Sequence, residues 1–219
     1  MKNLLRESAV FVAVALTAPC WLLVRVQQAL ARGKQMFAGC SEFLSMFPGL
    51  PGVYLRRGFY RMTLEACASD CHIGFGTTFA HPQARIGRGV YVGNRCMFGM
   101  VVIGDHATIG SNVDVLSGRR QHGFASLDAP IQEQGVAFER VHLGRNCWIG
   151  NSTVIMADVA DDCVIGAGSV VVKPIPPRSV AVGNPATVKR RRDAMPYPHE
   201  DSDRSSRMAA KEGVECTGY

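Results

Sequence analysis

The sequence predicts a mainly β fold, a parallel β-helix built from stacked six-residue units. Three observations predict it. Apolar residues recur at intervals of six with a few slips, namely Ile73, Ile86, Val92, Phe98, Ile103, Ile109, Val115, Leu143, Ile149, Ile155, Ile165 and Val171. Glycine directly follows most of them, and a small or thin side chain often lies four positions later. Six residues accommodate one short strand and one turn, so the apolar residues of successive coils would stack in the core. A helix does not fit, because six residues advance about 600° around its axis.

Residues 1–30 form a hydrophobic N-terminal segment that we expect to be helical. The 17 residues 8–24 carry no charge, although Pro19 interrupts them; Lys2 and Arg6 precede them and Arg25 follows. At 1.5 Å per residue they span about 25 Å, the short limit for crossing a bilayer. A membrane-spanning segment, a helix facing a membrane surface or partner, and a helix packed on the β-helix remain alternatives. A signal peptide is disfavoured, since no small-x-small cleavage site follows.

Residues 31–70 are expected to form a linker and a capping helix. Residues 31–52 mix glycine, proline and aromatic residues, which predicts a linker and turn. Residues 55–61 are expected to begin a short helix that covers the first coil, because a β-helix end exposes an unpaired strand. Its arginines, Arg56, Arg57 and Arg61, are expected on a solvated face, and contact with anionic lipid or an acidic acceptor is the alternative.

The β-helix domain is assigned to residues 71–190, and two irregularities interrupt it. Residues 118–140 fit no hexad and predict a long loop, which is typical of a functional segment. Ten residues separate Ile155 from Ile165 where two hexads need twelve, which predicts a shortened corner at residues 156–158. Residues 191–219 are polar and predict a disordered tail.

Composition excludes several classes of function. The formal net charge of +6 is modest, and no aromatic residues alternate with the basic ones, so nucleic-acid binding is not expected. The eight cysteines include no Cys-x-x-Cys pair, which argues against a metal site, and Cys96, Cys147 and Cys163 are expected as buried core thiols. So many unpaired thiols suit a reducing cytosol. We expect a cytoplasmic protein associated with the cytoplasmic face of the inner membrane.

Residues 71–190 resemble the hexapeptide-repeat acyltransferases. The resemblance lies in Trp148-Ile149-Gly150, in the stretch Ile165 to Val171, in Pro176-Pro177 and in Gly183-Asn184-Pro185-Ala186. It implies a left-handed β-helix whose triangular coils each contain three hexads. The C-terminal stretch is similar to that of the acetyl-CoA-dependent sugar and xenobiotic O-acetyltransferases. The resemblance therefore also implies a homotrimer that binds acetyl-CoA between subunits and holds no metal.

Acyl transfer to a hydroxyl needs a base, and histidine suits this role. His122 lies in the long excursion from the repeat, and the resemblance implies that it is the catalytic base. His72, His81, His106 and His142 are expected to be solvated turn residues, and His199 lies in the tail. Three carboxylates of the loop could orient the imidazole: Asp128, Glu133 and Glu139.

The resemblance also implies the cofactor groove. Trp148 and Asn151 would lie near the pantetheine, and Ala167 and Gly168 along its arm. Lys173, Lys189 and Arg190 would approach the phosphates. Core or trimer packing remains the alternative for Trp148, and turn geometry for Ala167 and Gly168.

The expected function is acetyl transfer from acetyl-CoA to a hydroxyl of a sugar or polysaccharide intermediate. A xenobiotic or amino-acid hydroxyl is the alternative acceptor, and a non-catalytic scaffold of a polysaccharide assembly complex is the alternative role. A zinc lyase of the γ-carbonic-anhydrase type is disfavoured, because the nearest histidine pair, His72 and His81, is nine residues apart.

Overall fold

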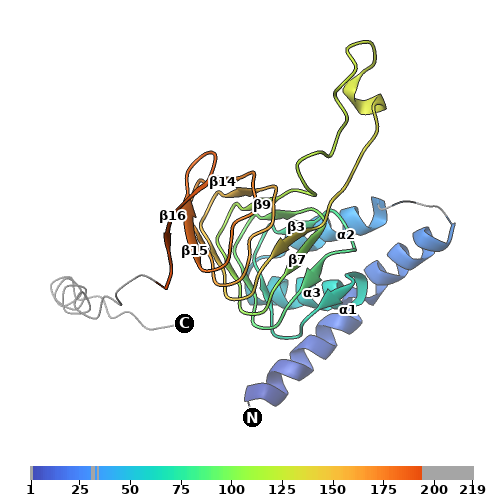
Figure 1. Cartoon of the computed structure of the whole chain (residues 1–219). Coiled ribbons are helices and arrows are strands. Elements are labelled where there is room, and N and C mark those ends of the chain that lie inside the picture. The colour runs from blue at the N-terminus through green and yellow to red at the C-terminus, as the bar shows by residue number, and fades with distance from the viewer. Residues whose placement is uncertain (1, 31–32, 34, 194–219) are drawn as a thin grey trace, which may run out of the picture.

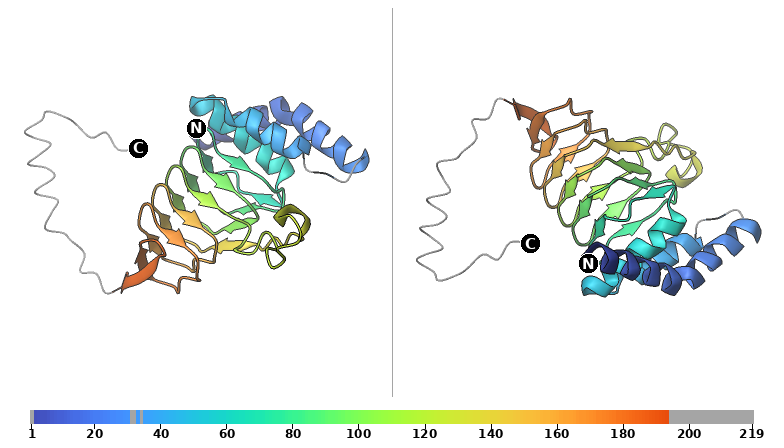
Figure 2. Two further views of the ribbon diagram at one scale, coloured as in Figure 1. Left: turned by 90° about the horizontal axis from the view of Figure 1, so that it is seen from above. Right: turned by 90° about the horizontal axis from the view of Figure 1, so that it is seen from below.

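The structure, a computed structural model, describes residues 2–30, 33 and 35–193. Within these residues a parallel β-solenoid has helices at one end and an antiparallel strand pair at the other (Figure 1). The coils stack along one axis (Figure 2). The parallel β-helix and the N-terminal apolar helix predicted from the sequence are confirmed.

Each coil contributes short strands to three parallel sheets, called faces A, B and C. Face A contains β1 (Ala66–Cys67), β4 (Arg85–Ile86), β7 (Val101–Ile103) and β10 (Val141–Leu143). Face B contains β2 (His72–Ile73), β5 (Tyr91–Val92), β8 (Thr108–Ile109), β11 (Trp148–Ile149), β13 (Val164–Ile165) and β15 (Ser179–Val182), with β16 (Thr187–Arg191) antiparallel to β15. Face C contains β3 (Thr78–Phe79), β6 (Met97–Phe98), β9 (Asp114–Val115), β12 (Val154–Ile155) and β14 (Val170–Val171). The parallel strands of face B define six coils in the described part of the chain.

The repeated apolar residues form ladders inside the solenoid. On face B the register joins residues that are all at most 1% exposed: Ile73, Val92, Ile109, Ile149, Ile165 and Ala181. Glycine follows the ladder residues because adjacent coils approach closely; a Cβ on Gly93 would lie 2.6 Å from the carbonyl carbon of Gly110. Cys96, Cys147 and Cys163 are buried, as predicted.

Three helices cover the first coil. They are α1 (Lys2–Leu30), α2 (Gln35–Ser45) and α3 (Gly49–Thr63). The prediction of a linker over residues 31–52 was wrong, since α2 and the start of α3 lie there. Pro51 is tolerated because it occupies the first turn of α3, where the backbone N–H has no partner within the helix. Pro19 does not end α1, which continues through it.

The prediction that Arg56 and Arg57 are solvated was also wrong. Their exposed fractions are 0% and 5%, whereas Arg61 is exposed. Nε of Arg56 donates to the Ile73 carbonyl at 3.0 Å, and Nη1 donates to the Phe47 carbonyl at 2.8 Å. Arg56 thereby ties the α2–α3 corner to the first coil.

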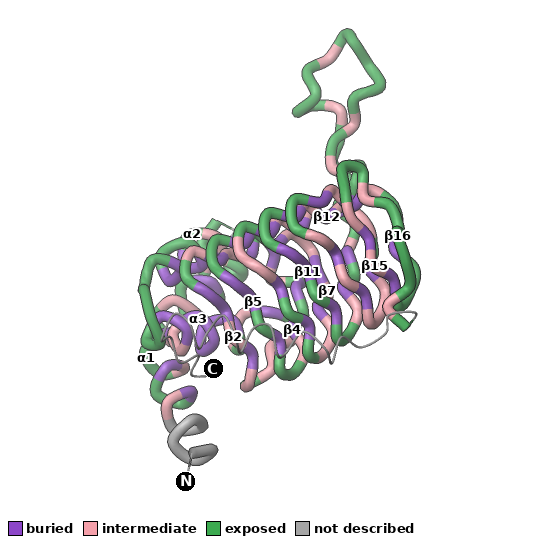
Figure 3. The backbone as a smooth tube through the Cα atoms, turned by 90° about the vertical axis from the view of Figure 1, so that its left-hand side faces the viewer, coloured by how far each residue is buried: buried purple, intermediate pink, exposed green. Residues whose placement is uncertain are grey.

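Two irregularities change the outline of the solenoid. Residues 118–140 form the predicted long loop, which projects far from the coils and is largely exposed (Figure 3). It contains one 3-10 turn, Ile131–Glu133. The predicted short corner is confirmed, because Val159 bridges Leu143 and Ile175 on face A only four residues after Ile155. Of the predicted tail, residues 194–219, with His199, lie outside the described residues.

Candidate functional site

The loop that carries His122 is a two-armed ribbon. It leaves β9 on face C and returns to β10 on face A, so it starts from the edge between these faces. The Gly123 amide donates to the Gly135 carbonyl at 3.1 Å, the Ala137 amide donates to the Gln121 carbonyl at 3.1 Å, and His122 forms a bridge with Val136. His122 is therefore held at a fixed position along the ribbon while its side chain is exposed.

The carboxylates that could orient His122 occupy different parts of the loop. Glu139 lies at its foot, where its amide donates to the Ser117 carbonyl at 3.0 Å. A Cβ on Gly118, which has a φ of +84°, would lie 2.7 Å from the Glu139 Cβ. Asp128 and Glu133 lie beyond the paired arms, toward the tip. The structure thus places Glu139 nearest to the coils.

Four of the predicted cofactor residues lie together on face B and the edge between faces B and C. Trp148 is exposed on the outer side of β11, and Asn151 occupies the turn that follows. The Gly168 amide donates to the Asn151 carbonyl at 2.9 Å, which sets Ala167 and Gly168 beside Asn151 on the next coil. These residues form a continuous exposed row across two coils.

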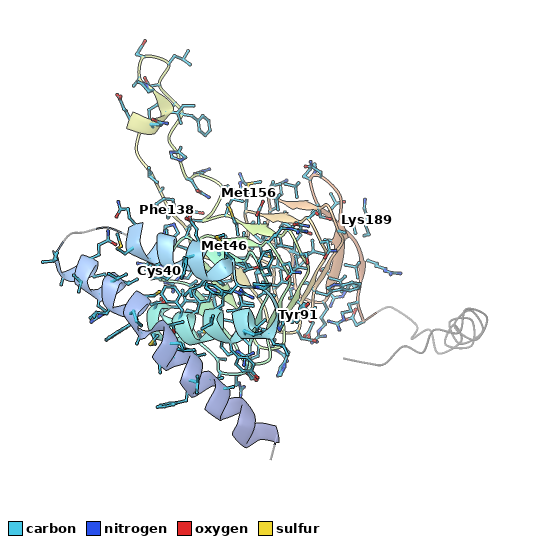
Figure 4. All side chains as sticks on the ribbon, turned by 180° about the vertical axis from the view of Figure 1, so that it is seen from behind. Cys40, Met46, Tyr91, Phe138, Met156 and Lys189 are labelled. Carbon is cyan, nitrogen blue, oxygen red and sulfur yellow. The ribbon has the colours of Figure 1, made fainter. Side chains whose placement is uncertain are left out.

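The basic residues divide into two groups. The register on face B runs from Trp148 through Val164 and Val180 to Arg190, so Arg190 is three strand spacings, about 14 Å, from Trp148. Lys189 precedes it on β16, at the far end of the solenoid from α2 (Figure 4). Lys173 instead follows β14 at the edge between faces C and A, close to the loop. There Nη1 of Arg119 donates to the Val172 carbonyl at 2.7 Å.

One chain does not bring His122 and the Trp148 row together. His122 extends from the edge between faces C and A, whereas Trp148, Asn151, Ala167 and Gly168 lie on face B and at its edge with face C. The two groups occupy different edges of a three-sided solenoid. A single chain therefore does not assemble the predicted base and the predicted groove into one site.

The structure also shows a hollow that the sequence analysis did not find. Its volume is about 350 Å³, and it lies between α2, face C and the foot of the loop. Apolar side chains dominate its lining, among them Phe79, Met97 and Phe98, and polar groups lie at Glu42, His81, Asp114 and Gln121. His81 is 7% exposed and meets the ring of Phe138 edge-on at 4.9 Å, so the expectation that it is a solvated turn residue was wrong. Figure 4 places Phe138 at the foot of the loop beside α2.

A second hollow of about 350 Å³ lies on the other side of the loop foot. Its lining includes Arg119, Arg120, Arg140, Glu139 and Asp158. Two basic groups there have partners, since Arg140 pairs with Glu65 at 2.8 Å and Arg119 donates to Val172. The loop thus separates a mainly apolar hollow from one that also contains several charged side chains. No group of three potential metal ligands occurs within the residues that the structure describes.

Comparisons with known proteins agree with this architecture. No family profile matches the chain. A candidate acetyltransferase of Staphylococcus aureus is 37% identical over 118 residues, which are 51% of this chain and 56% of that protein. Mitochondrial serine acetyltransferase 3 of Arabidopsis thaliana is 35% identical over 108 residues, 48% of this chain and 25% of that protein. The chain thus spans about half the length of the first of these relatives and a quarter of the second.

Solved structures extend the similarity to about three quarters of the chain. A maltose O-acetyltransferase from Clostridium difficile 630 has a TM-score of 0.62 and 25% identity, covering 72% of this chain and 86% of that one. A galactoside acetyltransferase in complex with coenzyme A has a TM-score of 0.55 and 24% identity, covering 78% and 83%. The resemblance to the hexapeptide-repeat acetyltransferases predicted from the sequence is confirmed.

Proposed function

We propose that the protein transfers an acetyl group from acetyl-CoA to a hydroxyl of a sugar or polysaccharide intermediate in the cytoplasm. The observation that carries this proposal is the projecting loop with His122 on a solenoid similar to that of a maltose O-acetyltransferase. The coenzyme A in the galactoside acetyltransferase structure supports the choice of donor. Trp148 and Arg190 are exposed on the same face, with the half-buried Val164 and Val180 between them, and offer an extended surface with a basic end for such a donor.

In the proposed reaction His122 removes the proton from the acceptor hydroxyl as its oxygen attacks the acetyl carbonyl carbon. The C–S bond then breaks, and coenzyme A leaves as the thiol after taking up a proton. A cysteine nucleophile is not required, and Cys96, Cys147 and Cys163 are all buried in the core. Burial also raises the pKa of Cys96, which disfavours its nucleophilic thiolate.

The proposed active site is shared between copies of the chain in a homotrimer. The loop of one copy would set His122 against the Trp148 row of its neighbour, because these groups lie on different edges of one solenoid. The apolar hollow at the foot of the loop is lined by Gln121, the residue before His122, and would receive the acceptor. Its size suits a sugar ring with an apolar substituent better than a small amino acid.

The test replaces His122 by alanine and follows thiol release from acetyl-CoA with a panel of maltose, galactosides and L-serine. We expect a loss of about 10²–10⁴-fold in turnover, because a general base contributes that much. His142→Ala is the matched control, since His142 is also exposed but lies on β10 of the solenoid. Unchanged transfer by the His122 variant would refute the catalytic assignment. Absence of acyl transfer by the native protein to every acceptor would favour the scaffold role instead.

A further inference from the structure

Helix α1 has two faces of different character. Its inner face is formed by Val10, Ala13, Thr17 and Val24, whose exposed fractions are between 1% and 5%. Its outer face is exposed and contains only apolar residues from position 11 to position 23: Phe11, Val12, Ala15, Leu16, Pro19, Leu22 and Leu23. Leu16, near the middle, is 66% exposed. A helix that is apolar on every side normally has all sides covered, so this outer face lacks a partner within the described chain.

The inner face of α1 packs against α3, which covers the first coil of the solenoid. A Cβ on Gly58 of α3 would lie 2.7 Å from the carbonyl carbon of Ala13, so the two backbones are in close contact. Val24 belongs to the same core cluster as the first coils. A helix that crossed a bilayer would have lipid or other spanning segments around its middle, but the middle of α1 contacts α3. While it is docked in this way, α1 cannot cross a membrane.

The chemistry of the outer face fits lipid better than a second copy of the chain. Protein interfaces keep a large polar share, whereas this row of seven residues has no polar side chain. Residues 9–30 are also long enough for a membrane helix, and their most apolar 18-residue window has a mean hydropathy of 2.1. In the sequence, residues 8–41 contain Arg25, Arg32 and Lys34 and no acidic residue, which favours an anionic surface.

We infer that α1 lies flat in the interface of an anionic lipid bilayer, with its outer row inserted among the acyl chains and the solenoid held outside. This surface is independent of the proposed acetyl transfer. It decides between the alternatives left open by the sequence, because the helix rests on the membrane instead of spanning it. The enzyme or scaffold would then work at the membrane surface.

The test is flotation of the full-length protein with vesicles of phosphatidylcholine and phosphatidylglycerol. We expect the native protein to float and Leu16→Glu to bind about tenfold more weakly, because a charge replaces an inserted side chain. Leu127→Glu is the matched control, since Leu127 is 99% exposed at the loop tip and should leave binding unchanged. Leu22→Glu, at a position 56% exposed, repeats the test should Leu16→Glu disturb folding.

The depth of α1 in the bilayer is measured from the fluorescence of Trp21. The variant Trp148→Phe is used because it leaves Trp21 as the single tryptophan. Trp21 lies near the middle of residues 9–30, so a spanning helix would place it at the bilayer centre. We expect quenching by lipids brominated near the headgroup and little by lipids brominated near the chain ends. Deep quenching would overturn the flat orientation. Failure to float, together with self-association that Leu16→Glu abolishes, would overturn the lipid assignment in favour of a second copy.

Discussion

Replacing Arg56 by methionine should destabilise the N-terminal end of the solenoid. Arg56 is fully buried and donates to four backbone carbonyls, those of Phe47, Ile73, Leu44 and Ser45, at 2.8, 3.0, 3.2 and 3.4 Å. Ser45 also accepts from the Gly76 amide at 2.9 Å, and Leu44 from the Phe47 amide at 3.5 Å. The carbonyls of Phe47 and Ile73 therefore depend most on the guanidinium.

Leaving two buried carbonyls without a donor costs about 2–6 kcal/mol, from about 1–3 kcal/mol each. Methionine recovers part of this, because burial of the charged guanidinium is itself unfavourable and lowers the pKa of Arg56. We expect a net loss of about 3 kcal/mol in the free energy of unfolding, or about 6–12 °C in Tm. The assay is urea unfolding followed by circular dichroism at one protein concentration, with Arg61→Met as the control because Arg61 is exposed on the same helix. A loss below about 1 kcal/mol for Arg56→Met would refute the reasoning.

Two further predictions concern the same end of the molecule. His72 stacks on Tyr91 at 4.7 Å, and burial and the charges of Arg57 and Arg56 lower its pKa from the ordinary 6.5. As the pH falls, His72 therefore takes up a proton in the unfolded chain before it does so in the folded protein. The contribution of neutral His72 to the free energy of unfolding is complete above pH 6.5 and is lost as the pH falls below that value. Urea titrations should show a smaller acid loss in His72→Phe than in the native protein; equal pH dependence would contradict the assignment. Gly58→Ala should displace α1 at a cost of about 1–3 kcal/mol, because its Cβ would meet the Ala13 backbone. Faster tryptic cleavage at the exposed Arg25, with unchanged solenoid stability, is the expected readout, and an unchanged rate would count against the docking of α1.

The coils were predictable because each coil has the same kinds of residues at the same positions. An inward aliphatic residue such as Ile149 and a following glycine such as Gly150 have the same neighbours in every coil, so their spacing alone reports the three-dimensional contact. The two departures, at residues 118–140 and after Ile155, were visible for the same reason. Any break in a regular spacing must be accommodated locally.

The helical cap was predicted less well because its contacts are not periodic. Glycine and proline at positions 48–52 indicated a turn, but Pro51 begins a helix instead of ending one. Arg56 looks like a surface residue in sequence, and only the carbonyls that converge on it from residues 44–47 and 73 explain its burial. A group of carbonyls that comes from separate segments leaves no recognisable pattern in the sequence.

The candidate site shows the same limit. His122 was found because the loop interrupts the repeat, whereas the hollow that includes Glu42, His81 and Asp114 joins α2, face C and the loop across more than seventy residues. His81 carries a weak signal, since Pro82 follows it at a coil corner. Nothing in the spacing places Glu42 beside it.

The central claim is that His122 and the Trp148 row act from different copies of the chain. Two variants inactivate the two halves separately: His122→Ala removes the base, and Ala167→Trp fills the groove from an exposed position without disturbing the core. Co-expression with two affinity tags and purification through both isolates the assemblies that contain both variants, which are trimers in the proposed arrangement. In every such trimer, one of the three interfaces combines an intact His122 with an intact groove, so we expect about one third of native activity. Mixed trimers as inactive as either variant alone would contradict the account.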